Sequence, residues 1–299
     1  MDTHSSDTAT GHSPAGRTGQ APTDRADLAP VEVRHLIQQW NTLDELLAGL
    51  KKDDWTTQTA LPGWSVRDVV AHVAGTEHML SGEPVPDVEL PASVREYVHN
   101  PIGELNEKFV QETRSMAVED VLEDFREAVA ERTRQLAEMS AADLEAETGS
   151  PVGRVPYRRF MGVRVFDCWV HEDDIRQAVG MQHHLGTDVG RFALGEIVRA
   201  LPRIVGKNAG APEGARVRFR VPGEADTDLS LNTDVVVDGR AALAEADSAV
   251  QPTVELVFDT PTFVRAATGR ITAEPGNGVQ VNGDDQLGRA ILRSMAFTI

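Results

Sequence analysis

One short segment of the chain carries a carboxylate and an imidazole four residues apart. It spans residues 164–176, reads RVFDCWVHEDDIR, and contains Asp167 and His171. In a helix, residues i and i+4 lie on one face, a single turn apart. The two side chains can therefore direct an oxygen and a nitrogen toward one point, as the ligands of a divalent metal ion do. A third ligand must come from elsewhere, and His72 is the best candidate.

Spacing alone leaves a second interpretation open, because an Asp/His pair of this kind is also typical of a surface ion pair or a hydrogen-bonded core histidine. The surrounding residues favour the metal site. Phe166, Trp169 and Val170 indicate a helix that is buried over much of its circumference. A buried Asp167 then needs a partner, since desolvating a lone carboxylate is costly. Asp174 lies about 20° from Asp167 around the helix, where it could orient a ligating imidazole or replace a ligand.

Cys168 is the only cysteine in the chain. A nucleophilic role is one interpretation, but its neighbours Asp167 and Glu172 are acidic and would raise the thiol pKa. It also lies about 60° from His171 around the helix. The pattern favours a packed core cysteine.

His72 follows a strong helix-start signal. The segment 61–68 reads LPGWSVRD, in which Pro-Gly predicts a turn and Ser65 with Asp68 forms a capping-box pattern. Valines at regular spacing mark the inner face of the helix, and His72 lies at the border of that face, about 110° from its centre. Taken alone, a histidine there is more typical of a hydrogen-bonded structural residue. Its border position would also let it face a cleft between helices.

Further helices are predicted over residues 31–50, 103–116, 117–139 and 157–179, with loops at 81–100 and before 157. They indicate an antiparallel bundle of four main helices, whose sites for cofactors are expected between facing helices. After Gly180 the pattern changes to a helix and short alternating strands, typical of a small α+β domain. The predicted elements are a helix over 191–205, strands over 215–221, 227–232, 234–238, 253–259 and 278–281, and helices over 261–268 and 284–295. The fold class is therefore α+β, with a disordered tail over 1–30, a metal-binding bundle over 31–182 and the small domain over 190–299.

Composition narrows the possible partners. The net charge of −18 argues against nucleic acid and anionic membranes. No stretch approaches the roughly 20 apolar residues of a membrane span. A single cysteine excludes an internal disulfide, and the N-terminus lacks a secretory signal pattern, so we expect a cytoplasmic protein.

Three segments resemble the mycothiol-dependent maleylpyruvate isomerase family: LPGWSVRDVVAHV at 61–73, NEKFV at 106–110, and the segment 164–176. Members of that family are DinB-like four-helix bundles, many with a sterol-carrier-like C-terminal domain. The resemblance implies a divalent ion, usually zinc, on His72, Asp167 and His171. Relatives carry Glu at the acid position. Aspartate is one methylene shorter, so it must approach the ion more closely or bind it through water.

The resemblance also implies the chemistry. Three protein ligands leave a fourth position on zinc, and the thiol mycothiol would bind there as a thiolate. The thiolate would attack a small electrophile, giving isomerisation or thiol transfer. A dianionic substrate would need cationic contacts, for which Arg114 and Arg270 are the candidates. The expected partners are thus a low-molecular-weight thiol and a small electrophile.

Two other functions stay open from the residues alone. The ion could stabilise a non-catalytic binding module whose C-terminal domain holds an apolar ligand or a protein. Alternatively, a bound water could act as the nucleophile of a metal-dependent hydrolase.

Overall fold

The computed structural model describes Met1 and residues 29–223 and 229–298. The predicted tail over 1–30 lies almost entirely outside these residues. So does the first part of the strand predicted over 227–232.

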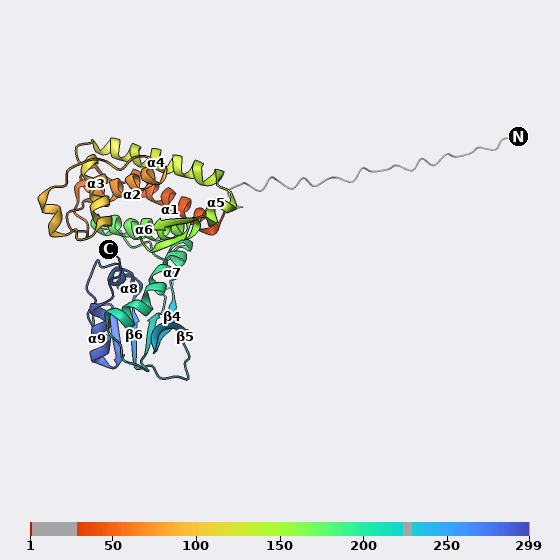
Figure 1. Cartoon of the computed structure of the whole chain (residues 1–299), viewed down its shortest axis with the longest axis vertical. Helices are drawn as coiled ribbons and strands as arrows, with labels where there is room; N and C mark the ends of the chain where they lie inside the picture. The colour runs from red at the N-terminus through yellow and green to blue at the C-terminus, as the bar shows by residue number, and fades with distance from the viewer. Residues whose placement is uncertain (2–28, 224–228, 299) are drawn as a thin grey trace.

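The helical half is built on the long helices α1, α2, α4 and α6, and the shorter α3 packs beside α2 (Figure 1). Helix α1 (Val31–Ala48) packs along α6 (Tyr157–Ala178), while α2 (Val66–Leu80) packs against α3 (Pro101–Thr113) and α4 (Val118–Glu138). This arrangement confirms the helical bundle. Among the described residues, no helix has both the length and the apolar composition needed to cross a membrane.

Short elements occupy stretches that the sequence analysis treated as loops. Two 3₁₀ turns form over η2 (Lys52–Thr56) and η3 (Ala92–Glu96), and a short helix over α5 (Ala141–Glu145). Strands β1 (Glu147–Ser150) and β2 (Gly153–Pro156) pair antiparallel just before α6. Elements of four or five residues are too short to show a hydrophobic period, so the sequence did not reveal them.

The start of α2 is fixed by the residues that predicted it. The backbone N–H and hydroxyl of Ser65 both donate to Asp68 Oδ2 at 2.8 Å. The turn before it places Gly63 at a φ of +77°, in the left-handed region that favours glycine. A Cβ at Gly63 would lie 2.7 Å from the Tyr97 ring. The turn therefore packs closely on Tyr97 and sets the direction in which α2 carries His72.

The C-terminal half is a five-stranded sheet with helices. The strand order is β5-β4-β3-β6-β7, in which β3 and β6 run parallel and the other neighbours antiparallel. Helix α7 contacts β4 and β5, whereas α9 contacts β6 and β7. The bounds are α7 (Asp188–Pro202), π-helical η4 (Arg203–Asn208), β3 (Arg216–Val221), β4 (Leu231–Asp238), β5 (Arg240–Glu245), β6 (Val254–Phe258), α8 (Thr260–Ala267), β7 (Val279–Gly283) and α9 (Asp285–Arg293). The α+β class is confirmed.

Strand β3 shows why this sheet was largely predictable. Val217, Phe219 and Val221 are buried and alternate with arginines on the other face. The guanidinium of Arg218 pairs there with buried Asp234 at 2.8 Å. The prediction was less accurate for the two strands that follow, β4 and β5. The strands predicted over 227–232 and 234–238 correspond to one strand, β4, and edge strand β5 was missed because its sequence, RAALAE, has mostly small apolar residues.

Helix α6 lies at the boundary with the C-terminal half, and the end of the chain returns to this boundary (Figure 1). Arg265 Nη1 lies 3.2 Å from Asp173, and Arg270 Nη2 lies 2.7 Å from Asp174. The rings of Phe166 and Phe297 stack with centroids 5.7 Å apart. The helix that carries the metal motif is thus also the main contact surface for the second half.

Candidate metal centre

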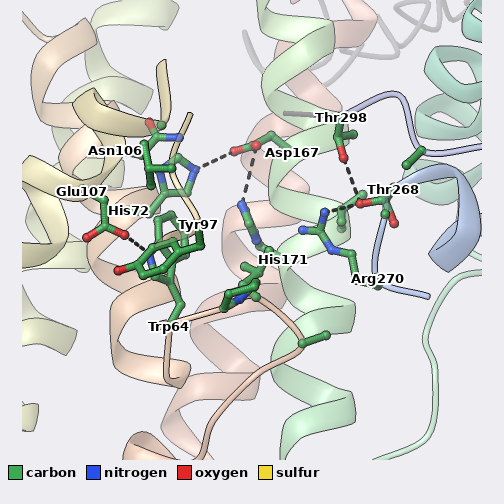
Figure 2. Close-up of a pocket in the computed structure, with 18 of the residues that line it drawn as sticks. Trp64, His72, Tyr97, Asn106, Glu107, Asp167, His171, Thr268, Arg270 and Thr298 are labelled. Carbon is green, nitrogen blue, oxygen red and sulfur yellow. Dashed lines mark hydrogen bonds and ion pairs between the residues drawn. The ribbon is translucent and has the colours of Figure 1, made fainter. Parts of the chain in front are cut away.

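The structure brings together His72 from α2 with Asp167 and His171 from α6 (Figure 2). His72 Nε2 lies 3.2 Å from Asp167 Oδ2, and His171 Nε2 lies 3.6 Å from Asp167 Oδ1. One ligand atom from each residue lies within 4.8 Å of the other two. Two ligand atoms on a tetrahedral zinc ion are about 3.4 Å apart for bonds near 2.1 Å. The spacing and the two-nitrogen, one-oxygen donor set therefore fit zinc.

Burial and charge keep His72 and Asp167 in the protonation states that a metal requires. Burial lowers the pKa of His72, which favours the neutral imidazole. Burial alone would raise the pKa of Asp167, but Arg164 and the two imidazoles hold it well below its usual range. Arg164 Nη1 lies 2.5 Å from Asp167 Oδ2. A carboxylate and a neutral imidazole are both ready to act as ligands.

A buried ion-pair network supports the triad from behind. Glu77, on α2, is fully buried and accepts from Arg164 Nη2 at 2.7 Å and from Arg132 Nε at 3.2 Å. Arg132 is itself fully buried and donates to the Tyr157 hydroxyl at 2.6 Å. Glu77 thus fixes the guanidinium that in turn contacts Asp167. The sequence analysis missed this network because its members lie up to 87 residues apart.

The two histidines differ in their outer contacts. His171 Nδ1 lies 3.1 Å from Asp174 Oδ2, one of the two roles expected for that carboxylate. Although burial would raise the pKa of Asp174, Arg270 and His171 lower it to about 2. The ionised Asp174 can therefore accept a hydrogen bond from Nδ1–H, which leaves Nε2 free to ligate. Within the described part of the chain, His72 Nδ1 is buried and has no hydrogen-bond partner. The ring is held by the contact of its Nε2 with Asp167 and by packing, including Trp64 at a centroid distance of 5.3 Å.

The triad faces a cavity of about 380 Å³ between the bundle and the C-terminal half. Its wall includes the side chains of Trp64, Tyr97, Asn106 and Glu107. Trp64 Nε1 donates to Glu107 Oε1 at 2.5 Å (Figure 2). Asn106 and Glu107 belong to the NEKFV segment noted in the sequence. Trp64 and Tyr97 were not singled out there, since aromatic residues are usually core residues and nothing local distinguishes these two.

The two candidate arginines lie in different places. Arg270 lines the cavity, but its Nε and Nη2 bind Asp174 and its Nη1 donates to the carbonyl of Thr268 at 2.6 Å. Arg114 is not among the described residues that line the cavity. It donates to the Gly63 carbonyl at 2.9 Å and lies 3.4 Å from Asp68. The structure therefore brings Arg270, and not Arg114, to the site.

Cys168 is fully buried, and its burial raises the pKa of the thiol to about 12 from a usual 9. At pH 8 this lowers the thiolate fraction about a thousandfold. We therefore expect Cys168 to react with iodoacetamide only when the protein is unfolded in urea, as measured by mass spectrometry over time. Rapid alkylation of the folded protein would instead indicate an accessible thiolate.

Comparisons with known proteins bear on the helical half and on the fold. Residues 36–176 match the family model described as "Mycothiol maleylpyruvate isomerase N-terminal domain". The crystal structure of the mycothiol-dependent maleylpyruvate isomerase aligns with a TM-score of 0.51 at 19% identity, covering 86% of this chain and 91% of that one. A histidine-to-alanine mutant of that isomerase aligns with a TM-score of 0.50 at 18% identity over the same shares. No curated protein matches the chain. Over residues 36–176 the chain is thus similar to the mycothiol maleylpyruvate isomerase N-terminal domain, and over most of its length it shares the fold of that isomerase.

Proposed function

We propose that this protein is a zinc-dependent enzyme that uses mycothiol to isomerise, or to transfer the thiol to, a small electrophile. The observation that carries the proposal is the set of three donor atoms on two helices at the wall of a cavity. The family relationship supports the choice of thiol. A reducing cytoplasm, where free thiols persist, would suit this chemistry.

Bound to the triad, zinc would lower the pKa of a thiol at its fourth position and hold the sulfur as a thiolate. The chain's own residues prepare the ligands and confine the reactants. Asp174 would accept a hydrogen bond from His171 Nδ1–H, so that the Nε2 lone pair is available to the metal. Arg164 keeps Asp167 ionised. The cavity then confines thiol and electrophile together, which raises their effective concentration.

The reaction begins with addition of the thiolate. In isomerisation the addition is later reversed, and in thiol transfer it is not. In the first step a C–S bond forms at one end of a conjugated double bond, and the π electrons move toward the electron-withdrawing group. For thiol transfer, the adjacent carbon takes a proton from water and the product leaves. For isomerisation, rotation about the former double bond precedes loss of the sulfur, which restores the double bond in the other geometry.

Thermal unfolding separates this proposal from the two alternatives. With zinc bound, mycothiol at 100 times its dissociation constant should stabilise the protein by about 2.7 kcal/mol and raise Tm by several degrees. After chelation the same thiol should have no effect. A non-catalytic binding module predicts no shift in either form, and a metal-dependent hydrolase predicts turnover without thiol. Either of these results would contradict the proposal.

Arg270 provides a test of the outer contacts of the site. Arg270→Ala should release Asp174 and weaken zinc binding by about 10- to 100-fold, the usual effect of losing an outer partner. Arg114→Ala should have a smaller effect, because Arg114 contacts the Gly63 turn and Asp68 and does not line the cavity among the described residues. Zinc titration and steady-state kinetics of both variants check this, with Arg126→Ala, at a surface pair with Asp44, as the control. Equal effects of all three substitutions would contradict the assignment.

A further inference from the structure

A second cavity of about 500 Å³ adjoins the first. His72, Asp167, Asn106 and Phe166 line both. We call the first cavity the polar arm and the second the apolar arm. Because two triad residues lie in the shared wall, a molecule that reacts at the metal could extend into either arm.

The apolar arm is lined by hydrocarbon and aromatic side chains from five parts of the chain. They come from α2, α3, α6, the turn between β1 and β2, and the segment after α9, and include Met79, Leu105, Val152, Phe160, Phe166 and Phe297.

Several polar side chains in the wall of the apolar arm are already paired. The Thr76 hydroxyl donates to the His72 carbonyl at 2.8 Å, and the Ser150 hydroxyl donates to the Gly153 carbonyl at 2.7 Å. Arg164 is held by Glu77 and Asp167, and Glu196 by Arg159 at 2.6 Å. A carboxylate that entered this arm would lose water without gaining a free cation from these residues, which is unfavourable.

The polar arm has the opposite character. Its wall includes a phenol, an amide, a carboxylate, a guanidinium and two hydroxyls, contributed by Tyr97, Asn106, Glu107, Arg270, Thr268 and Thr298. Mycothiol is a sugar-bearing thiol with many hydroxyl groups, and each buried hydroxyl needs a hydrogen-bond partner. The polar arm supplies more of these partners, whereas the apolar arm shares Asn106 and Thr298 with it and is otherwise lined mainly by apolar side chains.

We propose that the apolar arm binds an alkyl or aromatic group of the electrophile, while the thiol lies in the polar arm. This inference rests on the proposed function and specifies its substrate class. The preferred substrate is a hydrophobic electrophile, such as an α,β-unsaturated carbonyl compound with a hydrocarbon tail, and not a small dicarboxylate.

A homologous series of straight-chain α,β-unsaturated aldehydes, from crotonaldehyde to nonenal, tests the substrate class. The thiol sulfur bonds to the β-carbon, the π electrons move toward the carbonyl, and the α-carbon takes a proton from water, so no leaving group is needed. With the zinc-loaded protein and mycothiol, kcat/KM should rise about three- to fourfold for each buried methylene. Rates without enzyme are subtracted.

A binding measurement tests the location without turnover. The uncharged fluorophore N-phenyl-1-naphthylamine should bind the zinc-loaded protein, and Leu105→Trp, which fills the arm, should weaken binding at least tenfold. Leu243→Trp, at an exposed leucine of β5, is the matched control and should change nothing. Val152→Asp, at a position 52% exposed, places a charge at the arm without disturbing the core and should also weaken binding.

The outcomes distinguish the two proposals. Thiol-dependent turnover that is independent of chain length overturns the assignment of the apolar arm, as does fluorophore affinity unchanged in both Leu105→Trp and Val152→Asp. No thiol-dependent turnover of any aldehyde, with fluorophore binding still lost in the arm variants, overturns the proposed enzyme and leaves only an apolar binding site.

Discussion

Replacing His171 with alanine is expected to abolish stoichiometric zinc binding. The variant would keep only His72 and Asp167 as donors, and zinc sites in proteins almost always have three or four protein ligands. Loss of a direct ligand should cost more than the 10- to 100-fold typical of an outer partner, so affinity should fall by more than about 100-fold. Elemental analysis after dialysis should give about one zinc per chain for the wild type and almost none for His171→Ala or His72→Ala.

His184→Ala is the matched control for this experiment. His184 lies near the end of α6, where its Nδ1 contacts Glu172 at 2.9 Å, and it does not line the cavity among the described residues. The His184→Ala variant should bind zinc as the wild type does. Circular dichroism should show that this variant, His171→Ala and His72→Ala are all folded. Wild-type zinc affinity in both triad variants would contradict the assigned ligands.

Among the substitutions proposed here, Glu77→Gln should lower the free energy of unfolding the most. Glu77 and Arg132 are both fully buried, and Arg164 is nearly so. Removing one member of a buried ion pair leaves the other charge without compensation and costs about 3–5 kcal/mol. For a chain of this size, that lowers Tm by roughly 10 °C. Chemical denaturation and thermal unfolding of the zinc-free protein measure this effect without a contribution from the metal.

An exposed ion pair provides the comparison. Glu131 pairs with Arg134 at 2.6 Å on the surface of α4, where its side chain is 40% exposed. Because surface pairs contribute about 0–1 kcal/mol, Glu131→Gln should be nearly neutral. If Glu77→Gln and Glu131→Gln destabilise the protein equally, the buried network does not have the role assigned to it.

The parts of the fold that the sequence predicted depend on local patterns. A stripe of apolar residues defined α1, and the capping residues Ser65 and Asp68 defined where α2 begins. His72 was expected to look into a cleft because it borders the apolar face of its helix. The i,i+4 spacing of Asp167 and His171 required only that the segment be helical. These inferences use residues within a few turns of one another.

The remaining features depend on contacts between distant segments. Nothing near Glu77 in the sequence indicates that two guanidiniums from α4 and α6 surround it. Arg114 and Arg270 were equivalent candidates by composition, and only the packing of the two halves places Arg270 beside Asp174. The shorter aspartate at position 167 raised the question of reach. In the structure Asp167 Oδ2 lies 3.2 Å from His72 Nε2 and Oδ1 lies 3.6 Å from His171 Nε2, which are spacings that suit direct binding to a shared ion.

X-ray absorption at the zinc edge tests the central proposal most directly. The zinc-loaded protein alone should show a first shell of nitrogen and oxygen ligands at about 2.0–2.2 Å. Adding mycothiol should introduce one sulfur at about 2.3 Å, and a Cys168→Ser variant should give the same change, so that the sulfur is assigned to the added thiol. A first shell that stays free of sulfur at saturating thiol would contradict the account.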